Sequence, residues 1–178
     1  RYSKNIFSFR WTNEEREAIG LYEIVFDSSN KKDDKWYINT NQTFDFADDT
    51  VTASYGSATP REHADTLWTA QDEIDGKGTE GEVASEGLKT QLIRTVKQQA
   101  AGLLQDTDWY VVRKADAGTA VPSAITTYRA SVRTKADEME TSITNASNTP
   151  ALETLYTYTE QEDGSVTRPL GELPTLES

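Results

Sequence analysis

Two stretches in the middle of the chain repeat apolar residues at the spacing of an amphipathic helix, with charged residues between them. The connection between them holds a Thr107-Asp108-Trp109 turn, a break at Gly118 and a helix start at Pro122. This arrangement predicts an antiparallel helical hairpin over residues 82–147, in which two apolar stripes bury each other. The stripe residues are Leu88, Leu92, Val96, Ala100 and Leu103 in the first stretch, and Ile125, Tyr128, Val132, Met139 and Ile143 in the second.

Residues 1–58 contain shorter runs in which apolar and polar residues alternate, as they do in β-strands. Residues 21–26 and 35–39 are two such runs, and we expect them to pair as a hairpin with a long tip. Further alternation around Phe44 and Phe46 and over residues 51–55 adds one or two strands. We therefore predict a small antiparallel β-rich module with one short helix.

That helix is expected near the start of the module. Phe7, Phe9 and Trp11 alternate with polar residues, which is typical of an extended segment. Thr12 and Glu15 then have the spacing of a capping box, which predicts the first turn of a helix that ends at Gly20.

The periodic patterns are interrupted over residues 59–81, where Leu67 and Trp68 are the only large apolar anchors among acidic residues and glycines. We interpret this stretch as an acidic, glycine-containing linker.

Residues 148–178 form the last predicted segment. Asn148 and Pro150 indicate the start of a short helix, and Asp163-Gly164 favours a tight hairpin turn. Three leucines in the last ten residues suit a tail that lies in a groove. Taken together, these segments predict an α+β protein.

The composition narrows the classes of partner. Hydrophobic residues make up 35% of the 178 residues and the mean hydropathy is −0.70, so we expect an elongated shape or burial against other chains. A net charge of −12 argues against nucleic acid and anionic membranes as partners, because like charges repel. No stretch approaches the roughly 20 apolar residues of a membrane span. Because the chain opens on Arg1, we expect a processed or truncated product.

Candidates for catalysis are weak. His63 is the only histidine and the chain has no cysteine, so a Ser/His/Asp triad or a Cys/His pair has no independent support. No acid stands in an apolar setting that would raise its pKa, and no glycine-rich phosphate loop is present. We predict no enzyme activity, no catalytic residue and no cofactor.

One stretch approaches the pattern of a calcium-binding loop. Its residues fall at five positions of the twelve-residue loop, but the first position is not aspartate and the eighth is Gly78. A flexible acidic linker is the better explanation, and the acids of a strand turn are explained equally well by the turn itself. No bound metal is expected. The residues concerned are Gln71, Glu73, Asp75, Gly76 and Glu82 for the loop, and Asp45, Asp48 and Asp49 for the turn.

The aromatic residues allow two interpretations. They could form a sugar-stacking surface, or they could be anchors of a core or a protein interface, which is the more common role. We favour the second. The candidate interface aromatics are Trp11, Trp36, Tyr37 and Trp68.

Two strings of the chain combine uncommon residues at fixed spacing. The string around Thr107-Asp108-Trp109, continued by the Tyr128-Arg129 pair and Arg133, resembles the "LLxxTDWxxxR…P…YRxxxR" module of tailed-phage tail proteins, which include tail-fibre components and tail assembly chaperones. Residues 11–23 resemble the "WTxEEREALGIYEV" opening of the same kind of protein, and the acidic composition suits a marine phage such as a cyanophage. The matching residues of the first string are Leu103, Leu104, Thr107, Asp108, Trp109, Arg113, Pro122, Tyr128, Arg129 and Arg133.

The resemblance implies a helix over residues 109–112, where strand propensity alone would favour a strand. It also implies a virion protein that is made in the host cytoplasm and contacts other tail or fibre proteins in an oligomeric assembly. We expect Trp109 and Tyr128 to lock the helical hairpin, so that Trp109→Ala would cost about 3 to 5 kcal/mol if the tryptophan is buried. The other expected lock or interface residues are Thr107, Asp108, Arg113, Arg129 and Arg133.

Three functions are compatible with this resemblance. Chaperone-type relatives usually end soon after the second helix, whereas this chain continues past Met139 to the Asp163-Gly164 turn, which favours a structural virion component. The alternatives are an assembly chaperone that is absent from the mature particle, and a fibre domain that binds a host receptor or surface glycan.

Overall fold

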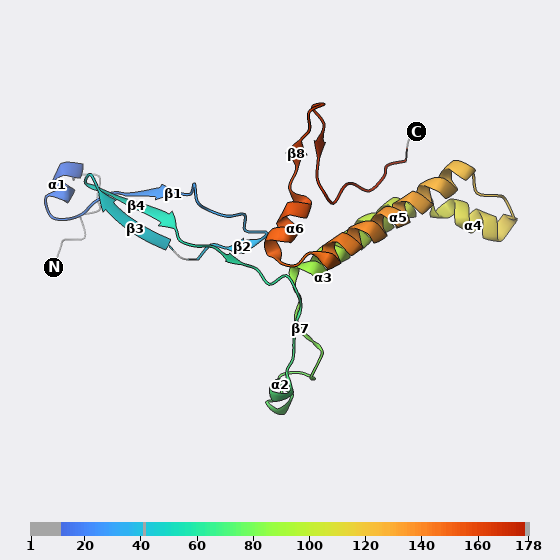
Figure 1. Ribbon diagram of the computed structural model, residues 1–178, viewed down its shortest axis with the longest axis horizontal. Helices are drawn as coiled ribbons and strands as arrows, with labels where there is room; N and C mark the ends of the chain where they lie inside the picture. Colours follow the sequence, from blue (N-terminus) through green and yellow to red (C-terminus); the bar gives the residue numbers. More distant parts are fainter. Residues whose placement is uncertain (1–11, 41, 177–178) are drawn as a thin grey trace. The chain divides into compact units, whose positions relative to one another are not determined.

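The computed structural model describes residues 12–40 and 42–176, and its elements confirm an α+β protein with six helices and nine short strands in the described part (Figure 1). The chain divides into two compact units, Arg1–Pro60 and Arg61–Ser178. The first unit holds most of the sheet structure and the second holds the long helices. None of the helices in the described ranges is long and apolar enough to cross a membrane.

The first unit begins with α1 (Asn13–Glu17), whose start matches the predicted capping box. The Thr12 side chain accepts a hydrogen bond from the Glu15 backbone N–H, and the Glu15 carboxylate accepts one from the Thr12 N–H. Gly20 has a φ of 80°, which lets the chain reverse after the helix. The extended segment predicted around Phe7 and Phe9 lies outside the described residues.

A three-stranded sheet follows, with strand order β1-β4-β3. Its strands are β1 (Ile24–Asp27), β3 (Gln42–Ala47) and β4 (Thr50–Tyr55). β3 and β4 form an antiparallel hairpin, and both turn residues, Asp48 and Asp49, have positive φ values of 48° and 56°. This is the geometry of a type I′ turn, which aspartate tolerates better than most residues.

The predicted pairing of residues 21–26 with residues 35–39 is wrong. β1 instead pairs in parallel with β4, so the sheet is mixed, while β2 (Tyr37–Ile38) pairs with β5 (Thr59–Pro60) in a separate ribbon. Asn30 supplies a physical reason, because its side chain exchanges hydrogen bonds with both the N–H and the C=O of Tyr55 and so holds the chain after β1 against β4.

The second unit opens with a structured hairpin where a linker was expected over residues 59–81. β6 (Thr66–Leu67) pairs with β7 (Val83–Ser85), and α2 (Ala70–Ile74) lies at the tip between them (Figure 1). Trp68 closes the base of the tip, where its backbone N–H and C=O bond to Glu82 and Gly81.

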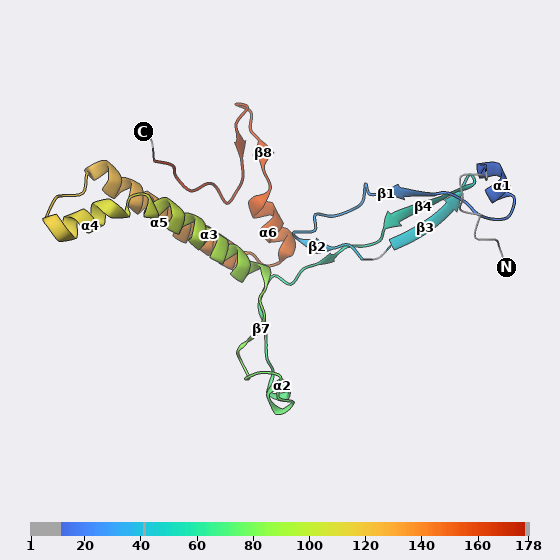
Figure 2. The same ribbon diagram turned by 180° about the vertical axis from the view of Figure 1, so that it is seen from behind.

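The predicted helical hairpin over residues 82–147 is present as α3 (Leu88–Gln105) and α5 (Ser123–Asn145), which lie side by side in both views (Figures 1 and 2). The helices are antiparallel, because Lys89 at the start of α3 donates to the Thr144 carbonyl at the end of α5. The stripe residues are buried except for Leu103, which is half-buried. Two further α5 residues, Arg129 and Ala136, are also buried.

Between these helices, residues 109–112 are helical as expected, within α4 (Asp108–Ala117). Gly118 ends α4 with a φ of 68°, a left-handed conformation in which its N–H reaches the Lys114 carbonyl. The break predicted at Gly118 is therefore confirmed.

The last segment folds largely as its pattern indicates. Asn148 caps α6 (Thr149–Tyr156) by accepting from the Ala151 N–H, and β8 (Thr159–Glu160) pairs with β9 (Val166–Thr167). Gly164 has a φ of 79° in the intervening turn. The tail then lies along the α3–α5 hairpin, where Leu170 is 2% exposed and Leu173 shares a cavity wall with Leu103 and Met139.

Arg168 fastens this tail to α6. Its guanidinium lies 5.2 Å from the ring centres of both Tyr156 and Tyr158 and forms a 2.8 Å ion pair with Glu172. Burial raises the pKa of Tyr156, and the hydrogen bond to Glu172 raises the pKa of Tyr158, so both phenols stay neutral at physiological pH.

Candidate functional site

The turn between α3 and α4 is built around the buried Arg129 of α5. Its guanidinium donates to the Leu104 carbonyl at 2.7 Å and to the Thr107 hydroxyl at 2.6 Å, and it forms a 2.8 Å ion pair with Asp108. Thr107 is only 2% exposed, and its hydroxyl donates in turn to the Leu104 carbonyl. Arg129 thus provides hydrogen-bond donors both to the carbonyl end of α3 and to the residues that begin α4.

The expected lock between Trp109 and Tyr128 is not formed. Tyr128 is buried in the α5 stripe, but Trp109 is 51% exposed and its ring stacks on Tyr110, with centroids 3.9 Å apart. The ion pair of Asp108 with Arg129 turns Asp108 toward α5, and the adjacent Trp109 lies about 100° further around α4, where its ring does not point at α5. Arg129 performs the role that was assigned to Trp109.

The remaining motif arginines lie outside the turn. Arg133 is exposed, and it donates a long 3.4 Å hydrogen bond to the Arg129 carbonyl. Arg113 lies on α4, with its guanidinium carbon 4.6 Å from the Trp109 ring centre and 5.4 Å from that of Tyr110.

These residues define the α4 surface, which consists of Trp109, Tyr110, Val112 and Arg113. α4 contains no buried residue, and Val112 is 64% exposed. The Nε atom of Arg113 has no hydrogen-bond partner among the described residues. Tryptophan, tyrosine and arginine are the residues most often found at the energetic centres of protein interfaces. The arrangement can bind a protein partner.

The first unit presents a second exposed cluster, on the β1-β4-β3 sheet. The strand registers place eight side chains on one side, of which Gln42 is polar and the other seven form what we call the apolar sheet face. The opposite side carries mainly threonine, serine and aspartate. The apolar sheet face consists of Ile24, Phe26, Phe44, Phe46, Val51, Ala53 and Tyr55.

The candidate interface aromatics lie in three different environments. Trp36 and Tyr37 are 3% and 9% exposed, so neither can stack on a sugar at the surface. Trp68 is half-buried, and its indole lies so close to Gly78 that a Cβ there would be 2.3 Å from its Nε1 atom. Trp11 lies outside the described residues.

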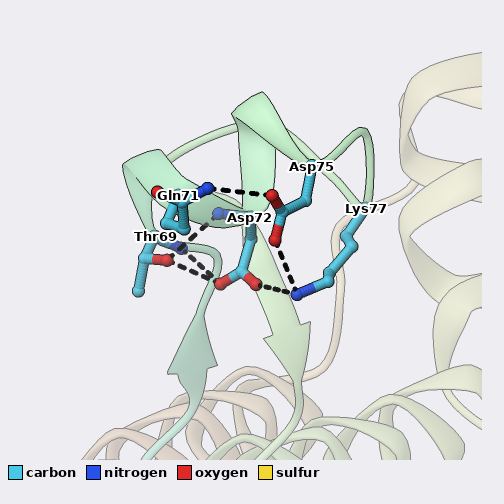
Figure 3. Close-up of polar contacts among 5 residues, drawn as sticks. All are labelled: Thr69, Gln71, Asp72, Asp75 and Lys77. Carbon is cyan, nitrogen blue, oxygen red and sulfur yellow. Dashed lines mark hydrogen bonds and ion pairs between the residues drawn. The ribbon is translucent and has the colours of Figure 1, made fainter.

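The stretch that approaches a calcium loop begins with the helix α2 and continues as turns. Thr69 and Asp72 form a capping box for α2, and Lys77 pairs with Asp72 at 3.0 Å and with Asp75 at 3.2 Å (Figure 3). The Gln71 side chain donates a hydrogen bond to Asp75, one helical turn further along the chain, at 2.8 Å. The hydrogen bond from Thr69, supported by Lys77, lowers the pKa of Asp72 to about 2. The spacing of Thr69 and Asp72 was a helix signal that the linker interpretation overlooked.

No group of histidine, cysteine, aspartate or glutamate residues within residues 12–40 and 42–176 is arranged to hold a metal ion. His63 is half-buried, and its backbone carbonyl accepts from the Lys89 N–H at the start of α3. The observed role of His63 therefore belongs to its backbone.

Comparison with known proteins finds no match to the chain among family models, curated proteins or solved structures.

Proposed function

We propose that this protein is a structural component of a tailed-phage virion, associated with the tail or a tail fibre, and that it acts through protein–protein contacts rather than catalysis. The sequence resemblance supplies the phage context. The α4 surface supplies the physical support, since it lies within the string that carries the resemblance.

The proposal rests on a difference between two groups of residues within that string. Thr107, Asp108 and Arg129 contact one another and hold the turn together. Trp109 and Arg113 instead contact each other, with an aromatic ring and a guanidinium stacked at the surface. Covering a half-exposed tryptophan is strongly favourable, so this surface suits a protein partner with an apolar pocket and an acidic rim.

The test is quantitative peptide mass spectrometry of gradient-purified particles of the source virus, with peptides from both units. Recovery at a fixed copy number relative to the major tail protein would support the proposal. Absence from particles together with abundance in infected-cell lysate would overturn it and would favour the assembly chaperone.

A matched pair of variants tests the α4 surface in the same particles. Trp109→Ala removes the central ring, whereas Val111→Ala removes an apolar side chain that is 44% exposed on the opposite side of α4. We expect the first variant to be depleted from particles by about tenfold or more, because losing one hot-spot contact costs at least that factor in affinity. The second should be incorporated normally, and equal incorporation of both would exclude the α4 surface as the contact.

A further inference from the structure

The apolar sheet face is divided into a trough and two ridges. Ala53, on the central strand β4, lies in register with Phe26 on one side and Phe44 on the other. It is 1% exposed, whereas Phe26 and Phe44 are 72% and 58% exposed. The two edge strands therefore present phenylalanine ridges, and Ala53 of β4 forms a trough between them, with Val51 and Tyr55 at its two ends.

Little of this face is covered by the described part of the chain. Tyr22 packs on Phe46, with ring centroids 4.5 Å apart, yet Phe46 remains 57% exposed and Ile24 46% exposed. Since an aromatic side chain buries about 150 to 250 Å² when it is covered, the face leaves roughly 400 to 500 Å² of apolar surface in contact with water. That lies within the range of about 300 to 600 Å² for the largest apolar patch on a typical monomer, and such patches are often functional.

We propose that the apolar sheet face is the interface between two copies of this chain, which pair face to face about a two-fold axis. Two sheets stacked in this way lie about 10 Å apart, with their strands at about 30°. The β3 ridge of each copy, Phe44 and Phe46, then occupies the β4 trough of the other, because a two-fold axis makes the contact reciprocal.

The area and the charge distribution both fit a second copy. Two faces together bury about 800 to 1,000 Å², which approaches the roughly 1,000 Å² of a specific protein interface and fits a weak dimer. No charged side chain lies on the face, and the strand acids Asp27 and Asp45 are on the opposite side. Each copy carries a net charge of −12, so pairing through the uncharged face avoids bringing acids together. Added salt should strengthen the pairing, because it screens the remaining repulsion.

The first experiment measures the mass of the full chain in solution by sedimentation equilibrium across a wide concentration range. We expect a monomer–dimer equilibrium, which shifts toward dimer as salt is raised. Phe26→Glu places a charge on the face and should weaken dimerisation by about 100-fold or more. Val25→Glu adds the same charge to the neighbouring position of β1, on the opposite side of the sheet, and should leave dimerisation within about threefold of the unmodified chain.

A second experiment locates the contact without adding charge. Because the chain has no cysteine, a single introduced thiol reports only on a second copy. A bis-maleimide reagent of about 10 Å span should join two copies of Phe44→Cys efficiently. It should join copies of Asp45→Cys, on the other side of the same strand, at the background rate.

Two results would overturn the proposal. One is a monomer throughout a concentration range that reaches about 1 mM. The other is a dimer that is unaffected by Phe26→Glu and is cross-linked equally at positions 44 and 45. Neither result bears on the virion proposal, which rests on the α4 surface and on recovery from particles.

Discussion

The α3–α5 hairpin and the β1-β4-β3 sheet were both predicted from regularly spaced apolar residues, but those residues are buried in the hairpin and largely exposed in the sheet. In the hairpin, each apolar stripe covers the other, and Val132 and Ile143 are fully buried. In the sheet, the strands form as their alternation indicates, but Phe26 and Phe44 remain largely exposed. The difference is that each helix of the hairpin covers the apolar stripe of the other, whereas the described residues cover little of the apolar sheet face.

The contrast shows what an apolar pattern in a sequence does and does not predict. Periodicity indicates which face of an element must leave water, because exposed apolar surface is costly. It does not indicate which chain provides the cover. Substitutions in the two regions test whether they differ as sharply in stability as they do in burial.

The largest effect is expected in the hairpin core. Ile143→Ala should lower the free energy of unfolding of the second unit by about 2 to 5 kcal/mol, because the residue is fully buried and its loss leaves a cavity. Phe26→Ala, at concentrations where the chain is monomeric, should change the stability of the first unit by less than about 0.5 kcal/mol. Hydrogen exchange followed by mass spectrometry reports the two units separately. Equal costs would remove the contrast.

The next effect concerns the turn at the end of the hairpin. Arg129→Met should cost about 2 to 3 kcal/mol, since the Leu104 carbonyl and the Thr107 hydroxyl both lose a charged donor. Arg133→Met, one turn further along α5, is the control and should cost less than about 0.5 kcal/mol. Urea unfolding monitored by circular dichroism measures both. A similar loss in the two variants would show that charge in general, rather than this hydrogen-bond set, stabilises the turn.

A smaller effect is expected at Trp109. The half-exposed ring makes Trp109→Ala cost about 1 kcal/mol, well below the 3 to 5 kcal/mol of a fully buried tryptophan. The same urea series provides the measurement. A loss above about 3 kcal/mol would restore the role of Trp109 as a lock and would weaken the proposal of a docking surface.

The smallest effect is local and depends on pH. The hydrogen bond from Thr69 and the ion pair with Lys77 lower the pKa of Asp72 from an ordinary 3.8 to about 2. Ionised Asp72 therefore stabilises the α2 hairpin fully above about pH 4, and this stabilisation is lost as the pH falls through about 2. Amide exchange over residues 69–77 should accelerate in that window while exchange in α3 is unchanged. Asp72→Asn should remove the pH dependence.

The helices were predictable because their information is local. Leu88, Leu92 and Val96 repeat within a few turns, and Gly118 and Asn148 mark helix ends through their own backbone or side-chain geometry. The partner of β1 was not predictable in this way. Alternation identifies Ile24 as a strand residue, but its pairing with Val51 depends on a contact across the whole intervening hairpin.

The burial of the residues in the candidate site was not predictable from the sequence either. Arg129 was included among the motif residues, but nothing in the sequence distinguishes a buried arginine from an exposed one, because both occur on helices with mixed charge. Trp109 was expected to be buried because tryptophan usually is. Its exposure follows from the rotation of α4, which the Asp108–Arg129 ion pair sets, and that pair exists only once the chain is folded.

The parallel pairing of β1 with β4 also determines an order of events during synthesis. β1 emerges from the ribosome before β3 and β4 do, and Ile24 meets its partner only when Val51 follows. At about 5 to 20 residues per second this delay lasts a few seconds. Once its residues are available, the β3–β4 hairpin can close within about 1 to 10 μs, since its turn is local. β1 therefore joins an existing hairpin as the last strand, and until then its apolar residues and its unpaired backbone must be kept from other nascent chains.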